Sequence, residues 1–151
     1  MKRLIKSPIV NAVCIGLFTL LYALYFPRSF EAARHALESG ALRGDPPFWT
    51  AWGRFLAHGH GTYIMWLLVA ATALVIVLLL LRRRPYDDYH AALLIHCLVV
   101  ALVLTMVAIG LLFAAVLSPG WITGKVALFI AVHWATVVFA NLAYVLLCRW
   151  R

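Results

Sequence analysis

Four long apolar stretches make up most of this chain of 151 residues, and none of them contains Asp, Glu or Arg. A helix needs about 20 apolar residues to cross a bilayer, because each residue adds about 1.5 Å of rise. The sequence therefore predicts an all-α integral membrane four-helix bundle, formed as a single membrane domain over residues 1–151. We expect its transmembrane helices at residues 8–26, 62–81, 89–117 and 121–148.

The charged residues indicate how the spans are oriented. The chain combines 66% hydrophobic residues with a net charge of +8, which excludes an ordinary soluble domain. Cations gather in residues 1–6, 82–84 and 149–151, which fall on one side if four spans alternate. The positive-inside rule then predicts a multi-pass protein of a bacterial-type inner (plasma) membrane, with both termini cytoplasmic. The lipid bilayer is the expected partner of these cations, and no nucleic-acid partner is expected.

The external segment 27–61 is predicted to contain two amphipathic, interfacial helices. Ser29 is a suitable N-cap for a helix over 30–39, in which Phe30, Ala33 and Leu37 share one face. We expect this helix to lie flat on the membrane surface.

The second external helix starts after Asp45 and two prolines. Phe48, Trp52 and Phe55 fall on one face of it. Aromatic side chains in such a pattern are typical of a helix at the membrane interface, so we expect this face to act as a membrane anchor.

Polar side chains inside the spans are the candidate functional residues, because burying them in hydrocarbon is costly. A cytoplasmic-side group and the midplane residue His133 form one candidate polar cluster. Its members are Asn11, Cys14, His96, His133, Asn141 and Tyr144. Helical spacing places His133, Asn141 and Tyr144 on one side of the last span, which should face the bundle. We expect His96 to hydrogen-bond Asn141 at the same depth.

No cofactor is required by this pattern, but two cofactor hypotheses arise from the histidines. A b-type haem held between His96 and His133 would make an electron-transfer protein, although their depths differ by roughly 7 Å when counted from the helix ends. His58 and His60, completed by His35, form a candidate zinc or copper site. Residues two apart on a helix point in opposite directions, so this site would require an irregular backbone.

We therefore expect a membrane interaction or accessory module rather than an enzyme, because the sequence contains no catalytic signature. A haem-binding electron-transfer protein and a small transporter or channel subunit are the alternatives. The expected partner is a membrane protein or a second copy of the chain. Ala12, Gly16 and Ala23 form a strip of small residues along the first span, suited either to packing within the bundle or to homodimerisation.

Overall fold

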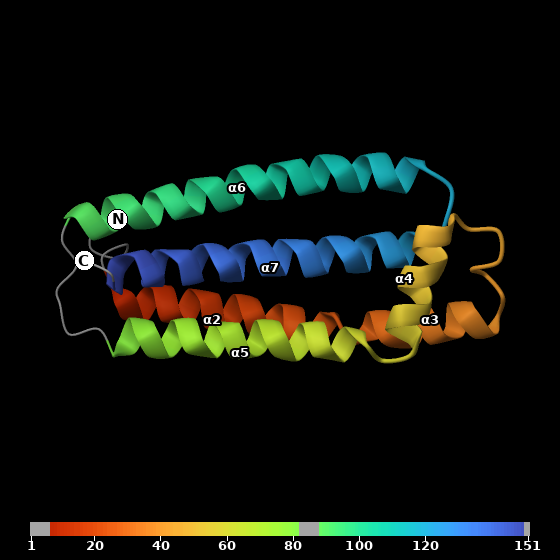
Figure 1. The fold of residues 1–151 in the computed structure, drawn as a ribbon, viewed down its shortest axis with the longest axis horizontal. Helices are drawn as coiled ribbons and strands as arrows, with labels where there is room; N and C mark the ends of the chain where they lie inside the picture. Colours follow the sequence, from red (N-terminus) through yellow and green to blue (C-terminus); the bar gives the residue numbers. More distant parts are fainter. Residues whose placement is uncertain (1–6, 82–87, 150–151) are drawn as a thin grey trace.

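The computed structural model describes residues 7–81 and 88–149, and this part of the chain is helical with no β-strand. The all-α architecture and the four long apolar helices predicted from the sequence are confirmed (Figure 1). The long helices are α2 (Pro8–Tyr25), α5 (Gly61–Leu80), α6 (Asp88–Leu117) and α7 (Ile122–Arg149). Two shorter helices, α3 (Arg28–Glu38) and α4 (Pro47–Ala57), join α2 to α5.

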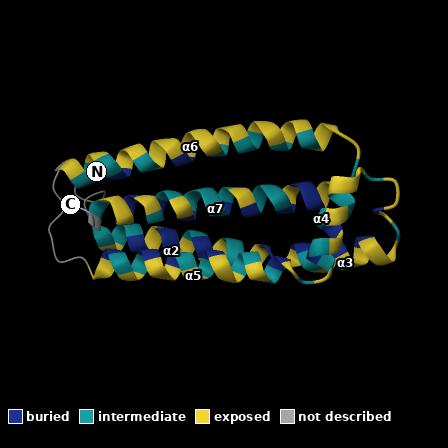
Figure 2. Ribbon diagram, viewed as in Figure 1, coloured by how far each residue is buried: buried dark blue, intermediate teal, exposed yellow. Residues whose placement is uncertain are grey.

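The long helices form a bundle that α7 holds together. α2 packs against α5, α5 packs against α7, and α6 packs mainly against α7. α2 begins and α7 ends at the same end of the bundle, with α3 and α4 at the opposite end (Figure 1). α6 has α7 as its main neighbour, and most of its surface is exposed (Figure 2).

α3 differs from the sequence prediction in its direction. It continues nearly in line with α2, so that Pro8–Glu38 form one helical run with an apolar α2 part, instead of turning to lie across the bundle (Figure 1). Pro27 allows this because it adopts a helical conformation, and the N–H groups of Ser29 and Phe30 bond to the carbonyls of Phe26 and Pro27. A proline at the start of a helix lacks only a donor that the first turn does not need. The predicted helix end at Pro27 is therefore only a short interruption, at Phe26 and Pro27, between two helices that are nearly in line.

α4 is the helix that runs across the end of the bundle (Figure 1). Its aromatic side chains do not all face outward as predicted. Trp52 and Phe55 stack on each other, 5.5 Å between ring centroids, and both pack on the bundle core. The Trp52 indole N–H donates to the Gly124 carbonyl of α7 at 3.0 Å, whereas Phe48 is exposed. An indole gains a hydrogen bond by turning inward, so two of the three aromatic residues cover the bundle instead of anchoring it.

A chain of hydrogen bonds joins three helices at the centre of the bundle. Trp134 of α7 donates to Thr19 of α2 at 3.3 Å, and Thr19 contacts Thr72 of α5 at 2.9 Å between hydroxyl oxygens. Thr72 in turn donates to the Leu68 carbonyl at 2.9 Å. The side chains of Trp134, Thr19 and Thr72 are all buried. These hydrogen bonds give each of their polar groups a partner away from water.

The strip of small residues on α2 packs inside the bundle. Ala12 is buried, and a side-chain carbon added at Gly16 would contact the Ile76 side chain of α5 at 3.6 Å. Close packing between α2 and α5 therefore uses this strip.

Candidate functional site: a groove between α2, α6 and α7

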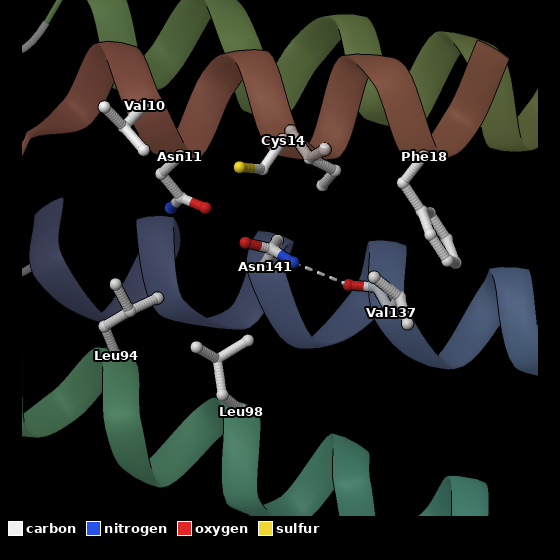
Figure 3. A pocket seen from close by; sticks show the side chains of 9 residues that line it. Val10, Asn11, Cys14, Phe18, Leu94, Leu98, Val137 and Asn141 are labelled. Carbon is white, nitrogen blue, oxygen red and sulfur yellow. Dashed lines mark hydrogen bonds between the residues drawn. The ribbon is translucent and has the colours of Figure 1, made fainter. Parts of the chain in front are cut away.

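A groove of about 340 Å³ lies between α2, α6 and α7, on the half of the bundle where α2 begins (Figure 3). It is almost entirely apolar apart from three polar side chains, those of Asn11, Cys14 and Asn141. The other residues that line it are Val10, Ile15, Phe18, Leu94, Leu98 and Val137.

Asn141 is only partly satisfied in this groove. Its amide nitrogen donates to the Val137 carbonyl one turn earlier on α7, at 2.9 Å. Its Oδ1 is buried and accepts no hydrogen bond, and the residue as a whole is 3% exposed. A buried acceptor without a donor is costly, more so where no water is at hand.

Asn11 lies across the groove from Asn141, as Figure 3 shows. Its Nδ2 is also buried and donates no hydrogen bond. The groove therefore presents one unused donor and one unused acceptor within an apolar wall. Small ligand sites in proteins have this composition, with a few polar groups set among apolar ones.

Helical periodicity explains how these residues come together. Asn11, Cys14, Ile15 and Phe18 recur at three- and four-residue intervals along one side of α2. Val137 and Asn141 are four apart on α7, as are Leu94 and Leu98 on α6. Cys14 is a free thiol and is exposed at the groove.

The structure brings together three of the predicted cluster residues, Asn11, Cys14 and Asn141, but leaves His96 outside. His96 is exposed, and its Nδ1 donates to the Ala92 carbonyl of its own helix at 2.7 Å. The predicted hydrogen bond between His96 and Asn141 is therefore wrong. A histidine can satisfy one ring nitrogen on the preceding turn of its own helix, so it does not require a partner on α7. Tyr144 is fully buried and packs in a core cluster with Leu94, beside the groove.

His133 lies in an aromatic environment in a different part of the bundle. Its Nδ1 is 2.5 Å from the hydroxyl oxygen of Tyr22 on α2. The Phe129 ring stacks on His133 with 5.7 Å between centroids, and Phe18 meets the imidazole edge-on at 5.6 Å. These contacts fix the orientation of the imidazole between α2 and α7.

The structure places His96 and His133 at different levels of the bundle. Leu94 and Leu98 lie beside Asn141, and Ala108 lies beside Val132, which sets the antiparallel register of α6 and α7. In that register His96 and His133 are separated by roughly 12 to 16 Å along the bundle axis, at about 1.5 Å per residue. His96 is also exposed and bonds to its own helix, so the described structure does not bring the two imidazoles to one level for a shared haem.

The other histidine hypothesis concerned His35, His58 and His60. The backbone between His58 and His60 is irregular, with Gly59 at a φ of 80°, and the two rings lie parallel with centroids 6.2 Å apart. His58 Nδ1 already donates to the Arg54 carbonyl at 2.6 Å. Over the described residues, no three His, Cys, Asp or Glu side chains are close enough to hold a metal ion. The arrangement is an aromatic stack, which His60 extends to Tyr63.

Sequence analysis identified the polar residues of the groove but not its walls. Asn11 and Asn141 stand out because amides are rare inside hydrocarbon. Leu94 and Leu98 carry no comparable signal, because similar leucines occur along all of α6. Comparisons with family models, with curated proteins and with solved structures find no match. The function is therefore inferred from the groove and from the exposed surface beside it.

Proposed function

We propose that this protein is a membrane accessory module that binds a transmembrane helix of a partner protein along the groove between α2 and α6. The observation that supports this proposal is the pair of buried, unused hydrogen-bonding groups, Asn11 Nδ2 and Asn141 Oδ1. A partner that completes both bonds removes the cost of leaving them unpaired.

The chemistry of the groove favours a carboxamide side chain from the partner. An Asn or Gln side chain carries one acceptor and two donors in one plane, which matches a donor and an acceptor on opposite walls. Interhelical hydrogen bonds of this kind contribute about 0.6 to 2 kcal/mol each in a bilayer. The groove of about 340 Å³ accommodates a single such side chain, and the partner helix itself would lie outside it.

Exposed apolar residues on both sides of the groove supply the remaining contact surface. Val13 and Leu17 of α2, and Leu98 and Leu102 of α6, are each exposed by 44% or more. Between transmembrane helices, association depends on close van der Waals contact and polar pairs, because lipid chains are as apolar as leucine. The polar pair at Asn11 and Asn141 therefore gives this surface its specificity.

We further propose a bacterial-type inner membrane with both termini in the cytoplasm. The cation-rich segments of the sequence support this orientation, although residues 1–6 and 82–87 lie outside the described part of the chain. In this orientation α4, which crosses the opposite end of the bundle with Phe48 exposed, lies at the external membrane interface.

Site-specific photo-crosslinking in native membranes tests the proposed function. A photoreactive amino acid at Leu98, which lines the groove, should give an adduct with one transmembrane segment of another protein. The same probe at Met106, exposed on α6 but outside the groove, is the matched control and should not give it. The double variant Asn11→Leu/Asn141→Leu should lower the adduct yield at Leu98 by about tenfold, equivalent to about 1.4 kcal/mol.

Three results would overturn the proposal. They are equal yields from Leu98 and Met106, adducts with lipid alone, and a yield that the double variant leaves unchanged. An adduct between two copies of this chain would replace the partner protein with a second copy.

A further inference from the structure

A second apolar pocket, of about 290 Å³, lies at the α4 end of the bundle and contains a buried cation. Phe48 and Trp49 of α4 form one wall, and the remaining walls come from α6 and α7. Lys125 of α7 lines this pocket and is 1% exposed. A lysine buried to this extent in an apolar setting is uncommon and requires compensation.

The Lys125 ammonium is held by neutral groups. Its Nζ donates to the Ser118 carbonyl at 2.6 Å and to the Pro119 carbonyl at 3.1 Å, and more weakly to the Ser118 hydroxyl at 3.3 Å. It also lies 5.7 Å from the centroid of the Trp49 ring. These contacts cap the C-terminal end of α6, where the helix dipole supplies about half a negative charge. The structure therefore buries Lys125 at the α6–α7 turn.

No carboxylate among the described residues forms an ion pair with Lys125. Asp45, the acidic residue near this turn, is engaged elsewhere, because its Oδ2 accepts the Trp121 backbone N–H at 2.8 Å. The positive charge is therefore only partly compensated. The third hydrogen bond, to the Ser118 hydroxyl, is the longest of the three and is the one that an anionic oxygen could replace.

The apolar part of the pocket continues from Lys125 along the two long helices. It follows α7 through Leu128 and Phe129 to Val132, a distance of roughly 10 Å at about 1.5 Å per residue. Ala108 and Ala115 of α6 leave room opposite. A charged end followed by an apolar channel matches a molecule with an anionic head and an acyl chain.

We propose that this pocket binds one anionic phospholipid, with its phosphate near Lys125 and one acyl chain between α6 and α7. Charge complementarity selects the headgroup, since a zwitterionic lipid would leave the lysine charge less well compensated. This site is separate from the groove at Asn11 and Asn141 and does not depend on the function proposed there.

Native mass spectrometry of the purified full chain tests this site. The protein is prepared in micelles containing equal amounts of dioleoyl phosphatidylglycerol and dioleoyl phosphatidylcholine. We expect one phosphatidylglycerol molecule to be retained about fivefold over phosphatidylcholine, since a cation near the headgroup contributes about 1 kcal/mol. Lys125→Gln should remove this preference.

Ala108→Trp provides a test that leaves Lys125 in place, because it fills the pocket with an indole ring. It should lower retention of both lipids, whereas Ala114→Trp, exposed on α6 outside the pocket, should bind as the unmodified protein does. The proposal is overturned if Lys125→Gln keeps the preference, or if Ala108→Trp and Ala114→Trp retain lipid equally. If Lys125→Gln does not fold, the two tryptophan variants decide the question.

Discussion

Trp134 of α7 donates its indole N–H to the hydroxyl oxygen of Thr19 on α2, with 3.3 Å between the two atoms and both residues buried. The direction of the remaining bonds follows from this contact and from Thr72. The Thr72 hydroxyl has one hydrogen and gives it to the Leu68 carbonyl, so Thr19 must donate to Thr72. The chain of bonds therefore runs in one direction, from α7 through α2 to α5.

Thr19→Val should destabilise the bundle by about 1 to 3 kcal/mol, because the Trp134 N–H loses its acceptor in a site without water. Valine has a similar shape, so little packing is lost. The matched control is Thr105→Val on α6, since Thr105 bonds only to the Ala101 carbonyl of its own helix. Unfolding in mixed detergent micelles, followed by tryptophan fluorescence, measures both variants. Equal stability losses would show that the threonine chain does not link the helices.

Gly61→Ala should be strongly destabilising. A side-chain carbon at this position would lie 2.3 Å from the Phe30 ring of α3 and 2.9 Å from Leu56 of α4. Overpacking of this kind costs typically about 1 to 3 kcal/mol, and a ring held between helices has little freedom to move aside.

Gly110→Ala is the control for that substitution, because no atom outside the adjacent helical backbone lies within 4 Å of the added carbon. It should be neutral or stabilising by up to about 1 kcal/mol, the difference in helix propensity. The midpoint of thermal unfolding in one detergent compares the two glycine variants. A lower midpoint of unfolding for Gly110→Ala would contradict this expectation, because it would show that the added methyl group is unfavourable at this position.

Asp45→Ala should loosen the start of α7, because the Asp45 carboxylate accepts the Trp121 N–H just before that helix begins. Loss of an N-terminal cap costs about 0.5 to 2 kcal/mol. Asp45→Asn keeps an oxygen acceptor and should retain most of the protection. Hydrogen exchange of the amides at residues 121–125 is the direct measurement, and unchanged exchange in Asp45→Ala would show that the cap contributes nothing.

Asn11→Leu and Asn141→Leu should leave the isolated protein as stable as before, or more stable. Each replacement removes a buried atom that has no partner, and only Asn141 gives up a hydrogen bond, to its own helix. The same variants should lose partner crosslinking at Leu98. A loss of stability equal to that of Thr19→Val would instead assign the asparagines a structural role.

The bounds of the four long helices were predictable to within one residue at each end, because hydrophobicity largely determines where such helices run. The continuation of the first helical run through α3 was not predicted. The neighbours of each polar side chain were less predictable. Depth along the spans placed Asn11, Cys14 and Asn141 in one group, and the structure brings them to one groove, but depth could not show that His96 bonds to its own helix instead of Asn141. For Trp52, the aromatic pattern was right and the direction wrong, because an acceptor on a distant helix decides it.

The packing order also constrains how the protein is made. The first two long helices, α2 and α5, can pair as soon as both have left the ribosome and entered the bilayer, since they contact each other directly. α6 enters next, and its main neighbour has not yet been synthesised. Its predominantly apolar surface lets it remain in lipid until α7 arrives. The α6–α7 contact therefore forms only after α7 has been translated, and a chain that ends before residue 122 would leave α6 without its main neighbour in the bilayer.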